Sequence, residues 1–374
     1  MPFNRYLDNQ KILSLKAAAL LGIFVLIALT AAQPAPQPEL APPPVAPQPA
    51  EQVSSGLTSQ AQAPDVALAT GNNRVFLPVI QTSSNIPITN SSSRQDAVAL
   101  YEQEYIGSNQ INPGWNGNIA NCTPGNTSSA FRDVVLRRIN YFRVMAGIPR
   151  ISGLSALYNQ QDQAAALTMA ANHDLNHSPP ANWKCVSSDS TAGAGNSNLA
   201  LGGYGSNAIN MYMDDGGVAS LGHRRWVLYP QTQTMGTGDI PGDGSGWQTI
   251  SNALRVFDDH MWDARPATSF AFVAWPPPGY VPYPVVYATW SFAVAGADFS
   301  SASVSVTVGG SPVSLASFNI LQSGFGENAI SWTLKDVSFG AGADKVCQVA
   351  VRGVKVGEQS KNYAYTVTVI DPSR

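Results

Sequence analysis

The spacing of hydrophobic residues changes once along this chain, from a helical repeat to an alternating one. Between about residues 129 and 215, apolar side chains recur three or four positions apart, which is typical of amphipathic helices. Between residues 285 and 370 they alternate with polar ones, which is typical of half-buried strands. Helices followed by strands favour an α+β fold or separate domains. We therefore predict two folded parts of different architecture.

Three helices and a sheet are predicted in the first part, residues 94–282. The first helix begins near Ser129 and stops before Gly147. The second helix covers residues 155–176, and the third covers residues 207–215. The residues of the second helix that we expect to face inward are Leu157, Ala164, Leu167, Ala171 and Leu175. Strands are expected at residues 225–229, 253–257 and 270–275.

The second part, residues 283–374, contains only strand patterns. Pro282 and Pro284 mark the junction, and the pair Gly309 and Gly310 is a tight hairpin signal. Its length of about ninety residues and the spacing of its strands predict a small β-sandwich. The strands are expected at residues 290–294, 303–308, 329–332, 346–351 and 363–369.

The amino terminus has the pattern of a secretory signal peptide, predicted at residues 1–32. Arg5, Lys11 and Lys16 precede an apolar run that ends in small residues, which suits cleavage before Gln33. The alternative is an uncleaved anchor, which would be the protein's contact with the membrane. Residues 33–93 are rich in proline and then in polar residues, which predicts a disordered linker. Both alternatives place the remaining chain outside the cytoplasm, in the extracellular space or at the cell surface.

Charge and cysteine content exclude several classes of protein. The chain has 21 Lys and Arg against 24 Asp and Glu, so no broad basic field exists to bind nucleic acid. Three cysteines are too few for a fold built on disulfides. Outside the cell we expect Cys122 and Cys185 to pair, since they flank the first two helices, and Cys347 to be a buried free thiol in a strand.

The order of several short motifs resembles the CAP superfamily, also called SCP-like. These motifs are an Ile-Asn-x-Phe-Arg helix, an alanine-rich helix followed by His-Ser, an Asn-Leu-Ala-x-Gly turn, a Tyr-Met-Asp-Asp helix end, and Gly-His-Arg-Arg-Trp. The likeness covers residues 131–279. It implies a three-layer α-β-α sandwich and a central cleft lined by two histidines and two acidic residues.

The resemblance implies which residues line that cleft. His177 and His223 match the two histidines, and Asp215 stands where the family usually has Glu. Ser197 replaces the second acidic residue. The family's cluster is associated with divalent metals, and two imidazoles with one carboxylate suit zinc or a similar cation, so His177, His223 and Asp215 are the candidate ligands.

Two catalytic alternatives use the same residues. His173 and His177 have the spacing of a zinc-protease helix, but Asp174 replaces the glutamate that would act as base. Ser197, His223 and Asp215 resemble a catalytic triad, but the serine lacks the glycine pattern of a nucleophile elbow. Both patterns are therefore disfavoured.

The family resemblance and the motifs together predict an exported protein that binds a small ligand. The expected ligand is a lipid, a sterol or a similar hydrophobic molecule, or else a component of the cell envelope. The alternative is a metal-assisted extracellular hydrolase or peptidase. A third possibility is purely structural, with the β-sandwich as an anchor that displays the first domain.

Overall fold

The computed structural model describes residues 93–374. The predicted signal peptide and almost all of the predicted linker lie outside these residues. Within residues 93–374, none of the helices combines the length and hydropathy needed to cross a membrane.

The three predicted helices are confirmed: α3 (Ser129–Met145), α4 (Ala156–Asn172) and α6 (Gly205–Asp214). Serine caps the first two, because the Ser128 hydroxyl accepts from the Phe131 amide and that of Ser155 from the Tyr158 amide. Two of the inward positions expected in α4 are wrong, since Leu157 and Leu175 are 55% and 41% exposed. Leu157 lies in the first turn of α4, and Leu175 lies beyond its end.

Three further helices were not predicted. They are α2 (Arg94–Leu100), which continues as the short helical turns Tyr101–Tyr105 and Ile106–Ser108, then α5 (Ser188–Gly195) and α7 (Gly222–Val227). The strand expected at residues 225–229 is therefore wrong, because residues 225–227 belong to α7 and residues 228–229 are not in a strand. Local β-propensity is overridden there because Arg224 and Arg225 are buried and donate hydrogen bonds to carbonyls of other segments.

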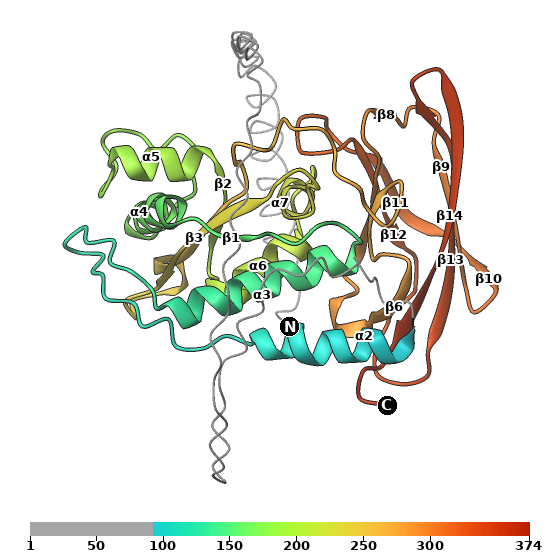
Figure 1. Cartoon of the computed structure of the whole chain (residues 1–374), viewed down its shortest axis with the longest axis horizontal. Coiled ribbons are helices and arrows are strands. Elements are labelled where there is room, and N and C mark those ends of the chain that lie inside the picture. Colours follow the sequence, from blue (N-terminus) through green and yellow to red (C-terminus); the bar gives the residue numbers. More distant parts are fainter. Residues whose placement is uncertain (1–92) are drawn as a thin grey trace, which may run out of the picture. The chain divides into compact units, whose positions relative to one another are not determined.

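The first part is a three-layer α-β-α sandwich, as the resemblance implied. Its sheet has the order β1-β3-β4-β2, in which β1 runs parallel to β3 and the other pairs are antiparallel. Helices α4 and α5 lie on one side of this sheet, and α3 and α6 lie on the other (Figure 1). The bounds are β1 Gly153–Leu154, β2 Ser197–Leu201, β3 Thr234–Pro241 and β4 Ile250–Arg255, with a 3-10 turn at Trp247–Thr249.

Glycines allow α4 to lie unusually close to this sheet. A Cβ atom on Gly238 of β3 would stand 2.0 Å from the backbone carbonyl carbon of Asp162 in α4, and one on Gly236 would stand 2.5 Å from Tyr158 Cβ. Only a residue without a side chain fits at such a distance. This close approach brings Asp162 against the strands, where it becomes part of the site described below.

Two sheets make up the C-terminal part. The six-stranded sheet has the order β10-β9-β13-β14-β6 with β8 paired to β13, and the four-stranded sheet has the order β11-β12-β7-β5. Their facing sides contact through aromatic rings, because Phe292 of β7 lies 5.3 Å from Tyr363 and 6.2 Å from Tyr365, both of β14. The bounds are β5 Val273–Trp275, β6 Gly279–Pro282, β7 Thr289–Ala293, β8 Ala297–Asp298, β9 Ser303–Val308, β10 Ser311–Val313, β11 Leu315–Ile320, β12 Ala329–Leu334, β13 Lys345–Val356 and β14 Gln359–Ile370, with a 3-10 turn at Tyr283–Val285.

The C-terminal sheets recruit strands from before the expected boundary at residue 283. Strand β5 pairs with β7, and β6 pairs with β14. One hydrophobic cluster also runs from Phe131 of α3 through Trp275 of β5 to Val367 of β14. The two parts therefore share a continuous core across the proline-rich junction.

Candidate functional site

His177 and His223 line one cavity of about 430 Å³, which we call the histidine cleft. The two residues are far apart in the sequence, since α5, β2 and α6 lie between them. The fold therefore brings together the two histidines that the motifs singled out. The other residues that line the cleft are Gly195, Ser197, Asn198, Val218, Ser220, Gly222, Trp226, Val256, Phe257, Gly324 and Phe325.

His177 is held by the end of helix α5. Its Nδ1 atom lies 2.8 Å from the carbonyl oxygen of Ala194. A carbonyl can only accept, so this contact assigns a proton to Nδ1, and in the neutral ring Nε2 then carries the lone pair. The residue lies after α4, which ends at His173 in the left-handed conformation. The ring of His177 is thus oriented by α5 rather than by its own helix.

His223 is held by Asp215. Its Nδ1 atom lies 2.7 Å from Asp215 Oδ1, and the backbone amide of Arg224 donates to Asp215 Oδ2 at 3.2 Å. The Asp215 side chain is only 1% exposed, and it comes from the residue that caps α6 in a left-handed conformation. Asp215 therefore orients the His223 ring and leaves Nε2 with a lone pair in the neutral ring.

The contacts of Asp215 differ from those of a metal ligand in the cleft. Asp215 lines a second cavity, of about 510 Å³, that shares His223 and Val218 with the histidine cleft. Among residues 93–374, no three His, Cys, Asp or Glu side chains converge as a metal site would require. Catalytic zinc sites have three protein ligands as a rule. The two imidazoles of the cleft do not by themselves form such a site.

Ser197 lines the cleft, but its hydroxyl is committed elsewhere. The hydroxyl donates to Asp162 Oδ1 at 2.8 Å, and the backbone amide of Arg255 donates to Asp162 Oδ2 at 3.0 Å. Within the disfavoured triad pattern, His223 and Asp215 are paired, whereas the Ser197 hydroxyl bonds Asp162 and not His223. Burial raises the pKa of Asp162 to about 8, and its hydrogen bonds offset only part of this shift. A lone acid within an alanine-rich helix was the one sequence signal for this residue.

Aromatic rings form the apolar side of the cleft. Trp226 of α7 packs edge-on against Phe257, with 4.5 Å between the ring centroids. Phe325 comes from the loop between β11 and β12, in the C-terminal part. The sequence reasoning missed all three rings. Only one of the rings had a sequence signal, because Trp226 belongs to the same Gly-His-Arg-Arg-Trp motif as His223.

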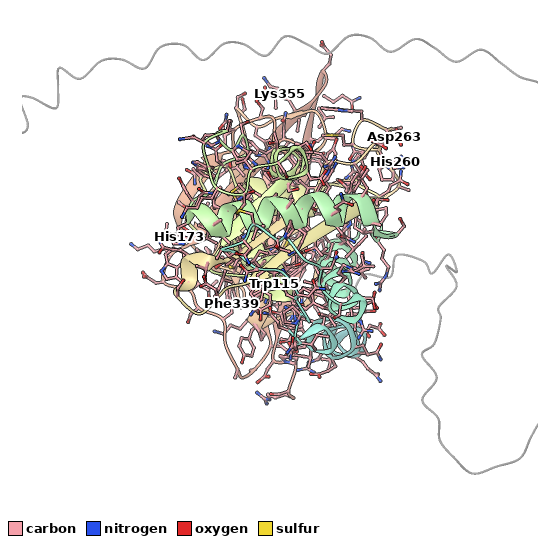
Figure 2. All side chains as sticks on the ribbon, turned by 90° about the vertical axis from the view of Figure 1, so that its left-hand side faces the viewer. Trp115, His173, His260, Asp263, Phe339 and Lys355 are labelled. Carbon is pink, nitrogen blue, oxygen red and sulfur yellow. A yellow bond between two sulfur atoms is a disulfide. The ribbon has the colours of Figure 1, made fainter. Side chains whose placement is uncertain are left out.

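The other predicted residues have structural roles or lie elsewhere. His173 is exposed and does not line the histidine cleft. Figure 2 shows His260 beside Asp263 and away from His173, and the Nδ1 atom of His260 lies 2.8 Å from that carboxylate. The predicted disulfide between Cys122 and Cys185 is confirmed. Cys347 is confirmed as a buried free thiol.

Comparison with known proteins agrees with this architecture. A layered α-β-α domain with a two-histidine cleft is the arrangement that the motifs implied. Residues 136–249 match the model of the CAP family, described as the cysteine-rich secretory protein family. The predicted CAP domain is therefore confirmed over residues 136–249, a segment that contains His177, Ser197, Asp215 and His223. No curated protein matches the chain. The CAP domain and the disulfide support an extracellular, ligand-binding role.

Proposed function

We propose that the protein binds a small amphiphilic molecule outside the cell, in the histidine cleft. The observation that carries this proposal is the pairing of two oriented imidazoles with an aromatic wall in one cavity of about 430 Å³. Cavities of roughly 300–1,000 Å³ with a few polar groups in an apolar lining are typical of small-molecule sites.

The chemistry of the cleft favours a ligand with one polar head. Both histidines bond through Nδ1, so each neutral ring offers Nε2 as an acceptor for a hydroxyl group. A protonated ring would instead donate to a carboxylate. Trp226, Phe257 and Phe325 offer apolar surface for the body of the ligand. These features suit a lipid, a sterol or a similar molecule.

Binding is favoured over hydrolysis by a serine nucleophile because neither cleft hydroxyl is bonded to a histidine. The Ser197 hydroxyl donates to Asp162, and that of Ser220 accepts from the Gly222 amide. Neither hydrogen bond involves a histidine, so neither serine has the partner that would activate it as a nucleophile.

The test measures binding of palmitate and cholesterol to the full chain by calorimetry. Replacing both cleft histidines (His177→Ala with His223→Ala) should weaken binding by about tenfold or more, because each lost hydrogen bond is worth about 1 kcal/mol. The matched control replaces the two histidines outside the cleft (His173→Ala with His260→Ala) and should bind as the wild type does. Equal affinities in both double variants would refute the cleft as the site, and absence of binding would refute the ligand class.

The same variants test a divalent cation. We propose that the two Nε2 atoms hold zinc at most weakly, since the cleft supplies two imidazoles and no carboxylate. Zinc titration should give heats that are lost in the cleft variant and kept in the control. Equal heats in both would reject these ligands.

A further inference from the structure

A loop of the C-terminal part reaches into the histidine cleft. The loop joins β11 to β12 and comprises residues 321–328, and its residues Gly324 and Phe325 line the cleft together with His177 and His223. It lies outside residues 136–249, which match the CAP family. One wall of the cleft is therefore supplied by a part of the chain that the family model does not cover.

A single arginine of α7 holds both ends of this loop. Arg225 donates to the Gln322 carbonyl at 2.7 Å and to the Glu327 carbonyl at 3.0 Å, and it also bonds the Ser220 carbonyl. The Glu327 carboxylate in turn forms an ion pair with Arg265. Since Arg225 and Glu327 are both buried, these contacts fix the loop rather than tether it loosely.

The ring of Phe325 packs directly on the residue that precedes His223. A Cβ atom on Gly222 would stand 2.8 Å from Phe325 Cδ1, so the ring occupies the space that any side chain at position 222 would need. The Arg225 guanidinium carbon lies 5.7 Å from the centre of the same ring. The ring therefore has a fixed place beside His223.

We propose that Phe325 is a specificity-determining residue of the histidine cleft, and that the C-terminal part completes the binding site. This inference rests on the proposed function. The fixed ring limits the breadth of the ligand beside His223, so that a flexible chain fits more readily than a rigid ring system. The C-terminal part is then a component of the site rather than an anchor alone.

The test compares palmitate and cholesterol, which differ in the breadth of the apolar body. In Phe325→Ala the affinity for cholesterol relative to palmitate should rise by about tenfold, as expected when a pocket gains room for a bulkier group. Phe325→Trp should shift the ratio in the opposite direction. The matched control is Phe318→Ala, an exposed phenylalanine on β11 that does not line the cleft, and it should keep the wild-type ratio.

A second measurement does not depend on any ligand. Diethyl pyrocarbonate modifies accessible imidazoles, and mass spectrometry of peptides gives the rate for each histidine separately. Phe325→Ala should raise the rate at His223 several-fold and leave the exposed His260 unchanged. Phe325→Leu, which keeps an apolar side chain, should show a smaller increase and serves if the alanine variant does not fold.

The outcomes separate this inference from the proposed function. If the wild type binds the probes, an unchanged cholesterol-to-palmitate affinity ratio in Phe325→Ala overturns the role of Phe325. An unchanged modification rate at His223 in the same variant also overturns it. If the wild type binds neither probe, the proposed function fails, and the rate at His223 alone decides whether Phe325 forms the wall.

Discussion

Replacing Asp162 with asparagine should stabilise the protein, and increasingly so as the pH rises. The carboxyl group is buried between α4 and the sheet, where Ser197 and the Arg255 amide are its partners. Burial raises its pKa from 3.8 to about 8. The folded protein therefore keeps a proton that the unfolded chain releases above about pH 4. The stability that this group contributes is full below pH 4 and is lost as the pH rises to about 8.

The size of the effect follows from the pKa difference. The unfolded chain releases the proton above pH 3.8, and pH 7 lies about 3 pH units higher. Each unit costs the folded protein about 1.4 kcal/mol of stability, so the loss at pH 7 is at most about 4 kcal/mol. Asparagine is neutral at every pH, and its amide can donate to the Ser197 hydroxyl while its oxygen accepts from the Arg255 amide. The Asp162→Asn variant should therefore not lose stability as the pH rises, and it should still bond both Ser197 and the Arg255 amide.

Urea unfolding of the full chain between pH 4.5 and 8.5 gives the free energy of unfolding of both proteins. Their difference should be small at pH 4.5 and grow by about 1.4 kcal/mol per pH unit toward neutrality. The control is Asp133→Asn, an exposed aspartate on α3, which should show no comparable growth. A variant that is less stable than the wild type at pH 7, or a difference that does not change with pH, would refute this reasoning.

Three further changes test other parts of the structure. Removing the disulfide (Cys122→Ser with Cys185→Ser) should lower the free energy of unfolding by about 4 kcal/mol, because the bond closes a loop with a sequence separation of 63. Gly238→Ala should cost about 3 kcal/mol or more, since its Cβ would stand 2.0 Å from the backbone of α4. Asp215→Asn should release the His223 ring from its single tautomer, as ¹⁵N NMR would show, because His223 and the Arg224 amide bond different carboxylate oxygens and asparagine replaces one of these acceptors with an NH2 donor.

Each of these changes has a control or a contrary result. Adding reductant to the wild type should reproduce the loss seen without the disulfide. A Cβ atom on Gly246 would have open space around it, so Gly246→Ala should lower the free energy of unfolding far less than Gly238→Ala. Equal losses in the two variants would show that close packing is not the cause. An unaltered tautomer in the Asp215 variant would mean that another contact orients His223.

The helices of the first part were predictable because their apolar spacing agrees with their environment. Helix α3 buries the stripe that begins with Phe131 and Val135, as the sequence indicated. Helix α7 was not predictable, because its aromatic and β-branched residues favour a strand locally. Its conformation is set instead by distant contacts, such as the bond from Arg224 to the Thr289 carbonyl. Propensity is a weak guide where buried polar groups find distant partners.

The sequence predicted the polar residues of the histidine cleft but not the aromatic residues that line it. The two histidines carry a motif, so the resemblance to a family identified them. The role of Asp215 depends on an atomic contact with His223, which a motif does not specify. Phe325 comes from another part of the chain, and a single aromatic residue between two glycines gives no signal that it reaches the cleft. Contacts of this kind follow from the packing of whole sheets.

The position of His223 depends on both parts of the chain through a second buried arginine. The Arg224 side chain donates to the carbonyls of Met213 and Asp214 at the end of α6, and to the carbonyl of Thr289 in β7. Burial lowers the pKa of Arg224 to about 10, and the nearby carboxylates of Asp215 and Asp214 offset part of this shift. The three carbonyls replace the water that the guanidinium loses on burial. Arg224 thus ties α7, which carries His223, to the helix that ends at Asp215 and to the C-terminal sheet. The pairing of histidine and aspartate is therefore a property of the whole fold, and a fragment that ended before β7 would lose one of its supports.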